Sequence, residues 1–255
     1  MQFKDAEILL GASILTGYPP LFVVGPNGIG KTELIKTEAQ YYNEKFKNIG
    51  EVIKFTTGMD YGGLKQFVQY GDKTVKTIAL SDIQTILARK SNVMSSTIGY
   101  ISTLAEEGVS EELTFSKFNR TLDSRKLNFI IGSTPRHTVR LVRFEQIDFL
   151  TRFLYLPVDR NITQVDVSKP YPIHELPTTF DDTLLKDWTK LGELDIHVNS
   201  ARDSKMISHL FLTLLAMGYA AEYANILIKQ IKLFREPDDT DKSWQKLYSR
   251  VLVPL

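Results

Sequence analysis

Short apolar runs alternate with longer segments whose apolar residues recur at helical spacing through the first 160 residues of the chain. Apolar runs of about four to eight residues between turn residues are typical of strands that are buried on both faces of a parallel sheet. The pattern predicts strands over residues 21–24, 52–57, 75–80, 127–132 and 153–158. It predicts helices over residues 6–15, 32–46, 64–70 and 83–107, the last broken near residue 91, and a hairpin over residues 111–126. Alternating strands and helices indicate an α/β fold, a three-layer domain with a largely parallel sheet.

The character of the chain changes after Asp159, where prolines and polar residues predict a linker. Two amphipathic segments then predict helices over residues 206–215 and 224–234, and the tail over residues 244–252 is expected to form a last helix. The predicted organisation is a core over residues 1–165, a linker over residues 166–182, and a small helical lid with a C-terminal tail over residues 183–255.

Composition excludes several classes of function. The 255 residues include no cysteine, which excludes disulfides, thiolate metal sites and cysteine nucleophiles. The four histidines are scattered without metal-ligand spacing, so we expect them to be solvated or packed. No run is long and apolar enough to span a membrane, and the acidic N-terminal residues are unlike a signal peptide, so we expect a cytoplasmic location, the host cytoplasm if the chain is viral. With a formal charge of +1, any nucleic acid would have to meet local basic clusters.

The segment between the first strand and the next helix fits the spacing G-x-x-x-x-G-K-[ST]. Its residues are Gly25, Pro26, Asn27, Gly28, Ile29, Gly30, Lys31 and Thr32. A strand, a glycine loop and a helix in this order are the context that a phosphate-binding loop requires, although a glycine-rich turn can match by chance. Glycines let the backbone curl around a polyphosphate while N–H groups and the helix N-terminus point at it. Lys31 would reach the β- and γ-phosphates of ATP, and the Thr32 hydroxyl would ligate Mg²⁺.

A carboxylate follows the third predicted strand. Asp82 stands at the carboxyl end of residues 75–80, the edge of a parallel sheet at which ligands bind. It could hold Mg²⁺ directly or through a water molecule. The alternative is a helix N-cap, and the two roles are compatible.

The order of these features resembles the AAA+ ATPase family over roughly residues 5 to 235. More narrowly, the chain is similar to AAA+ ATPases of archaeal viruses and plasmids, some of which are described as similar to the DnaA replication initiator. The resemblance implies that Ser133 or Thr134 is the polar sensor after the fourth strand, in contact with the γ-phosphate or the attacking water. It implies that Arg152 is an arginine finger lent by a neighbouring subunit, and that Arg202 contacts the phosphates from the lid. The alternative for each arginine is a salt bridge at a surface or an interface.

The chain departs from the family pattern at the third strand. That pattern ends in two adjacent acids, one for the metal and one for the water, whereas Asp82 stands between Ser81 and Ile83. If Asp82 holds the metal, the base position is Ile83; if Asp82 is the base, Ser81 replaces the metal acid. Glu106 and Glu107 could supply the missing carboxylate, but the preferred interpretation is that they lie on a solvated helix end. Hydrolysis is therefore expected to be slow, or absent without a partner.

The leading hypothesis is an AAA+ ATPase that assembles into a homo-oligomeric ring, such as a hexamer, and remodels or loads a DNA-replication complex. Basic residues that could face DNA phosphates in such a ring, or form solvated faces or subunit contacts instead, are Arg120, Arg125, Lys126, Arg136, Arg140 and Arg143. The alternatives are a nucleotide-gated scaffold that binds ATP with little or no hydrolysis and a small-molecule phosphotransferase.

Overall fold

Strands and helices alternate along the computed structural model, which describes residues 1–48, 50–113, 119–143, 146–159, 180–198, 200–234 and 252–254. The first half consists of α1 (Phe3–Thr16), β1 (Leu21–Val24), α2 (Lys31–Lys45), β2 (Ile53–Thr56), α3 (Tyr61–Tyr70), β3 (Thr77–Leu80), α4 (Gln84–Leu87) and α5 (Ser91–Glu106). The second half consists of β4 (Val109–Leu113), β5 (Asn119–Arg125), β6 (Asn128–Ser133), α6 (Pro135–Arg143), α7 (Ile147–Leu150), β7 (Leu154–Pro157), the 3-10 helices η1 (Asp182–Lys186) and η2 (Trp188–Glu193), α8 (Ala201–Ala216), α9 (Ala221–Lys229), β8 (Lys232–Phe234) and β9 (Leu252–Pro254). The five predicted strands are confirmed, as is the broken helix over residues 83–107.

The main sheet has the strand order β2-β3-β6-β1-β7-β8-β9 within the described residues. The pairs from β2 to β7 are all parallel, whereas β8 and β9 are antiparallel additions at one edge. Strand β1 lies between β6 and β7, so the loop that follows it leaves from the middle of the parallel part. The carboxyl ends of β3, β6 and β1 meet at one edge, which we call the carboxyl edge.

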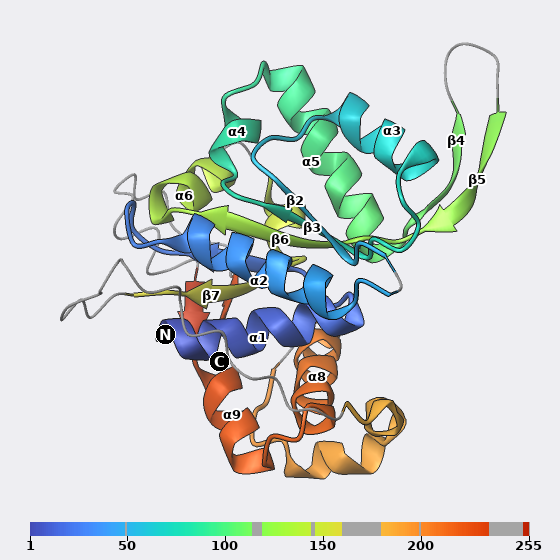
Figure 1. Ribbon diagram of the computed structural model, residues 1–255. Helices are drawn as coiled ribbons and strands as arrows, with labels where there is room; N and C mark the ends of the chain where they lie inside the picture. The colour runs from blue at the N-terminus through green and yellow to red at the C-terminus, as the bar shows by residue number, and fades with distance from the viewer. Residues whose placement is uncertain are drawn as a thin grey trace.

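Helices cover both faces of this sheet (Figure 1). One apolar cluster joins β1 residues such as Leu21 and Val23 to the inner faces of α1, α2, α8 and α9. A second cluster joins Phe22 and Val24 to α3, α5 and α7. Because successive residues of β1 enter opposite clusters, the strand is buried on both faces, and the three-layer α/β architecture follows.

The C-terminal part differs in detail from the prediction. Helix α8 is confirmed, but α9 ends at Lys229, and Lys232–Phe234 forms β8 beside β7 instead of continuing the helix predicted to residue 234. Leu252, predicted at the end of a tail helix, begins strand β9. The linker predicted over residues 166–182 falls mostly outside the described residues, as does the tail over residues 244–251.

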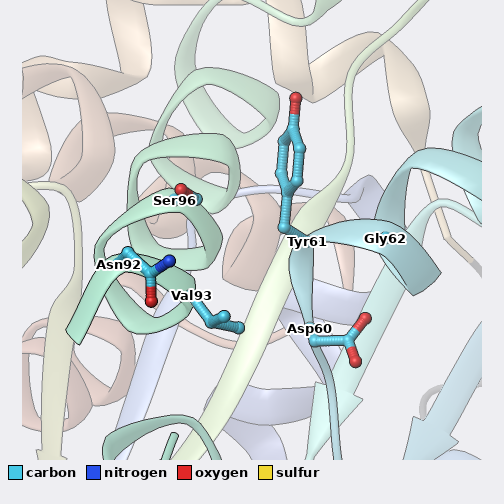
Figure 2. A pocket seen from close by; sticks show the side chains of 6 residues that line it. All are labelled: Asp60, Tyr61, Gly62, Asn92, Val93 and Ser96. Atoms are coloured by element: carbon cyan, nitrogen blue, oxygen red, sulfur yellow. The ribbon is translucent and has the colours of Figure 1, made fainter. Parts of the chain in front are cut away.

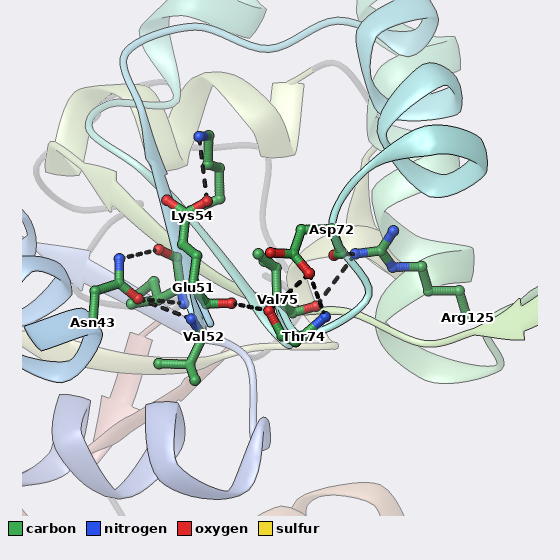
Figure 3. A network of polar contacts seen from close by, with 9 residues as sticks. Asn43, Glu51, Val52, Lys54, Asp72, Thr74, Val75 and Arg125 are labelled. Carbon is green, nitrogen blue, oxygen red and sulfur yellow. Dashed lines mark hydrogen bonds and ion pairs between the residues drawn. The ribbon is translucent and has the colours of Figure 1, made fainter. Parts of the chain in front are cut away.

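Strands β4 and β5 form a separate antiparallel hairpin that projects from the body of the molecule (Figure 1). Its base is held by Arg125, which donates to the backbone oxygens of Phe67 (2.8 Å) and Asp72 (2.5 Å) at the end of α3. The same region anchors the edge strand β2, because Thr74 donates to Glu51 and Asn43 pairs with the backbone of Val52 (Figure 3). No helix of the described residues is both long and apolar enough to cross a membrane.

Candidate functional site

The glycine loop Gly25–Thr32 joins β1 to α2 at the carboxyl edge. Gly28 and Gly30 have φ angles of 78° and 91°, a region in which a side chain is strained. Helix α2 begins at Lys31 and its first backbone bond runs from the Leu34 N–H to the Gly30 carbonyl (2.9 Å). The N–H groups before Leu34 therefore have no acceptor within the helix, and no described side chain caps it. This end of α2 can receive an anion.

The side chain of Lys31 folds back into this loop. Its Nζ donates to the carbonyl oxygens of Gly25 (2.8 Å) and Pro26 (2.7 Å), and the residue is only 6% exposed. Burial lowers the pKa of Lys31, while the negative charge of Asp82 opposes that effect. The loop thus encloses an ammonium group, and the Thr32 residue beside it is exposed.

The end of β6 lies between the loop and Asp82. Val24 pairs with Ser133, and the Gly25 N–H donates to the Ser133 carbonyl (3.2 Å). The Ser133 hydroxyl is buried and bonds to Thr138, whereas the Thr134 hydroxyl accepts the backbone N–H of His137 (3.2 Å). An accepting hydroxyl still has its own proton to donate, so Thr134 is the better placed of the two predicted sensor residues.

Asp82 lies just beyond β3, and its position is set by a glycine. A side chain at Gly132 would approach the Ser81 carbonyl oxygen to 2.1 Å, so only glycine lets the segment after β3 cross the end of β6 this closely. The Ile83 N–H then donates to the Gly132 carbonyl (2.8 Å). Ile83 is fully buried, and Asp82 remains as the acid that this segment presents.

His137 is the functional candidate that sequence reasoning missed, because isolated histidines are usually structural. Its Nδ1 lies 3.2 Å from Asp82 Oδ1, which also accepts the Gln84 N–H (2.8 Å). Burial alone would raise the pKa of Asp82, but the hydrogen bonds from His137 and Gln84 and the charges of His137 and Lys31 hold it below its usual value. Asp82 is therefore a carboxylate. Its bond to the Gln84 N–H lies at the start of α4, although the N-cap residue of that helix is Ile83, so the helix-cap alternative is supported only in part. The signal in the sequence was a histidine in the first turn of the helix that follows β6.

Two predicted site residues lie at the opposite edge of the sheet. The Leu154 N–H donates to the Pro20 carbonyl, so Arg152 lies where β1 and β7 begin. The glycine loop follows the other end of β1, and at about 3.3 Å per strand residue the two ends are roughly 15 Å apart. Arg152 forms an ion pair with Glu106, and Arg202 bonds to the other oxygen of Glu106 (3.1 Å) and to Thr151 (2.8 Å). The expectation that Arg202 contacts the phosphates is therefore wrong for the loop of its own protomer, because Arg202 lies at the other edge of the sheet. Glu106, considered as a substitute for the missing carboxylate, is likewise at the wrong edge.

The basic residues predicted to face DNA separate into three groups. Arg125 is buried against backbone carbonyls, which removes it from that role. Arg136 and Arg140 are exposed on α6, close to the carboxyl edge. Lys126 lines a cavity beside Arg152, and the side chains of Arg120 and Arg143 fall outside the described residues.

Two of the cavities in the described part of the chain open to solvent away from the glycine loop, which lines neither of them. The first, about 310 Å³, lies between the start of α3 and the first turns of α5, with Asp60, Tyr61 and Asn92 around it (Figure 2). Asp60 caps α3 by accepting the Gly63 N–H (2.8 Å), so its carboxylate is already bound. The second, about 280 Å³, lies at the opposite edge from the loop and includes Arg152 and Arg202. No group of three or more metal-ligating side chains was found among the described residues.

Comparison with known proteins adds no family to this geometry. No protein-family model matches the chain, and no curated protein matches it.

Proposed function

We propose that the chain binds a nucleoside triphosphate, ATP with Mg²⁺, in the loop Gly25–Thr32. The observation that carries the proposal is Lys31, which is folded into a glycine loop at the carboxyl edge with the carboxylate of Asp82 beside it. An open, positive-φ glycine at position 28, an uncapped helix start and a buried ammonium group together fit a polyphosphate.

Each residue at this edge has a distinct task in the proposal. Lys31 would exchange its two loop carbonyls for phosphate oxygens, and the N–H groups at the start of α2 would bind the same anion. Thr32 and Asp82 would hold Mg²⁺, which neutralises charge on the phosphates when bound. The Thr134 hydroxyl would donate a hydrogen bond to a γ-phosphate oxygen or to the attacking water.

We further propose that the activity is an AAA+ type ATPase that works in a homo-oligomeric ring. The two edges of one protomer are too far apart for Arg152 to serve its own loop, which supports a role at the loop of a neighbour. A heterologous contact that closes on itself gives a ring. DNA, or a DNA-bound replication protein, is the partner expected from the resemblance, and the exposed Arg136 and Arg140 near the carboxyl edge are compatible with it.

The test is nucleotide binding and turnover in three variants. We expect Lys31→Ala to abolish ATP binding, and Asp82→Asn to retain binding while turnover falls by at least about a hundredfold. Lys54→Gln, an exposed ion-pair residue on the edge strand β2, is the control and keeps both. ATP binding that survives unchanged in Lys31→Ala would refute the assignment of the loop. Stimulation of turnover by single- or double-stranded DNA tests the partner.

The second candidate function is a nucleotide-gated scaffold without hydrolysis. It is favoured by the burial of Ile83 and by the distant position of Glu106, which leave Asp82 without the second, adjacent acid of the family pattern. Turnover that is lost in Asp82→Asn would exclude it. ATP-dependent assembly with no phosphate release would support it.

A further inference from the structure

The cavity at the opposite edge from the glycine loop has an unusual charge balance. Its basic lining residues are Lys126, Arg152, Arg202 and Lys205, and its acidic lining residue is Glu106. Four positive charges and one negative charge leave an excess of three. Among the described residues neither Lys126 nor Lys205 forms an ion pair with a carboxylate.

Glu106 holds the two arginines together from the end of α5. One of its carboxylate oxygens pairs with Arg152 and the other with Arg202. The Nε of Arg152 is buried and has no hydrogen-bond partner among the described residues, so the guanidinium retains an unused donor. A single carboxylate therefore does not satisfy the donors that converge here.

Like charges crowd one another around the cavity. Burial, and then the charge of Lys205, lowers the pKa of Lys126, while burial and the charge of Arg202 lower that of Arg152. The aromatic ring of Tyr18 lies 5.5 Å from the Lys126 ammonium and gives that side chain a partner other than an acid. Burial raises the pKa of Tyr18 to about 12, the charge of Arg202 opposes this, and Asp203, which does not line the cavity, adds to it.

We propose that this cavity is a second anion site that takes a di- or triphosphate, and that Glu106 occupies it as a built-in counter-ion which the phosphate displaces. Arginine forks bind phosphate oxygens in the same bidentate way as they bind a carboxylate. A volume of about 280 Å³ is near the lower limit for ligand pockets, which suits a compact anion rather than a large organic ligand. Arg202 is 40% exposed at its side chain and Arg152 21%, so an incoming phosphate would meet Arg202 and Lys205 first.

Two sources could supply this anion. One is free polyphosphate or nucleotide, and the other is the triphosphate held by the loop of a neighbouring protomer, which rests on the proposed function. The site itself needs only the residues of one protomer. Its test is therefore separable from the test of the glycine loop.

The experiment uses Lys31→Ala, in which the glycine loop is disabled, and titrates it with inorganic tripolyphosphate in a calorimeter at low salt. We expect one binding site per chain, with an affinity for tripolyphosphate that falls as the salt concentration rises. Adding Glu106→Gln should tighten binding by about tenfold, because the competing charge is removed. Adding Arg202→Gln together with Lys205→Gln should weaken it by at least about tenfold, because charge-assisted hydrogen bonds are lost.

Controls separate this site from general charge and from misfolding. Lys54→Gln removes a positive charge far from the cavity and should leave the affinity unchanged. Lys205→Gln alone changes an exposed side chain and serves if the double variant does not fold. Absence of tripolyphosphate binding to Lys31→Ala, or equal affinities in the cavity variants and the Lys54 control, would overturn the proposal. Wild-type protomer loaded with ATP and mixed with Lys31→Ala tests the neighbour as the source: complex formation that Arg202→Gln weakens assigns the anion to the neighbour's loop.

Discussion

At the scale of single residues, the contact between His137 and Asp82 gives the carboxyl edge a polar pair where the sequence offered one acid. The histidine ring fixes one carboxylate oxygen by its Nδ1, and the Gln84 N–H binds the same oxygen. The other oxygen forms no hydrogen bond with the described residues, so it remains available to a ligand. Partners of this kind orient metal-binding groups and alter their affinity.

Replacement of His137 tests this orienting role. We expect His137→Ala to reduce turnover, and the affinity for Mg²⁺ in the presence of ATP, by roughly tenfold, because the Asp82 carboxylate loses its restraint. His137→Asn keeps a donor near the position of Nδ1 and should restore most of both quantities, measured by turnover assay and by magnesium titration. Equal losses in the Ala and Asn variants would mean that the ring only fills space.

A second residue-scale prediction concerns acids buried between α1 and α2. Burial raises the pKa of Glu38 to about 8, with a further contribution from the charge of Glu7, whose own pKa burial raises to about 7. A carboxyl with a raised pKa binds a proton more readily in the folded state, so its contribution to stability is largest below pH about 4.5 and is lost as the pH rises toward 8.

Glu38→Gln removes this titration. We expect the variant to have a free energy of unfolding about 2–4 kcal/mol above wild type at pH 9 and a much smaller difference at pH 5. Urea denaturation at the two pH values measures it, with the exposed Glu33→Gln on the same helix as the matched control. A difference that does not change between pH 5 and pH 9 would contradict the raised pKa.

At the scale of elements, α1 and α2 approach closely at Gly11. A side chain at this position would lie 2.2 Å from the hydroxyl oxygen of Tyr42, which is buried and finds no hydrogen-bond partner in the described ranges. Burying a hydroxyl without a partner costs free energy, and overfilling a packed contact costs more. The contact is therefore tight and imperfectly satisfied.

These two features predict a coupled pair of substitutions. Tyr42→Phe should raise the free energy of unfolding by about 1 kcal/mol, because it removes the unpaired hydroxyl. Gly11→Ala should lower it by about 1–3 kcal/mol in wild type. In the Tyr42→Phe background the same change should cost much less, because the closest atom is gone and alanine favours a helix. Thermal and urea unfolding of the four proteins measure the coupling, and strictly additive effects would contradict it.

The elements also show how far the sequence could lead. The strands and the glycine loop were predictable because their signals are local: apolar runs, glycine spacing and the turn residues between them. Strand β8 was not, since Ile231 and Phe234 continue the helical spacing of α9 and only pairing with β7 makes this segment a strand. The contact of His137 with Asp82 and the burial of Arg125 depend in the same way on elements far apart in the sequence.

At the scale of the whole molecule, the structure separates the candidate nucleotide site from Arg152 and Arg202. The glycine loop follows β1 and the arginines lie where β1 and β7 begin, so a full site as proposed needs two protomers. Glu106 occupies the arginines in the isolated chain. On assembly, Arg152 and Arg202 would exchange their ion pairs with Glu106 for contacts with a phosphate held by the neighbouring protomer. The two arginines would therefore leave Glu106 only when that phosphate is present.

This separation predicts that two inactive variants can complement each other. Lys31→Ala damages the loop edge and Arg152→Gln damages the arginine edge, so a mixed contact between an intact loop and an intact arginine should work. With random assembly of equal amounts, about a quarter of the contacts have both intact, and turnover should recover to roughly that fraction of wild type. Lys31→Ala mixed with Asp82→Asn is the matched control, because both damage the same edge and every contact remains defective. If turnover also recovers in the control mixture, Arg152 does not act at the neighbour's site. The same conclusion follows if turnover does not recover in the mixture of Lys31→Ala with Arg152→Gln while both variants still assemble.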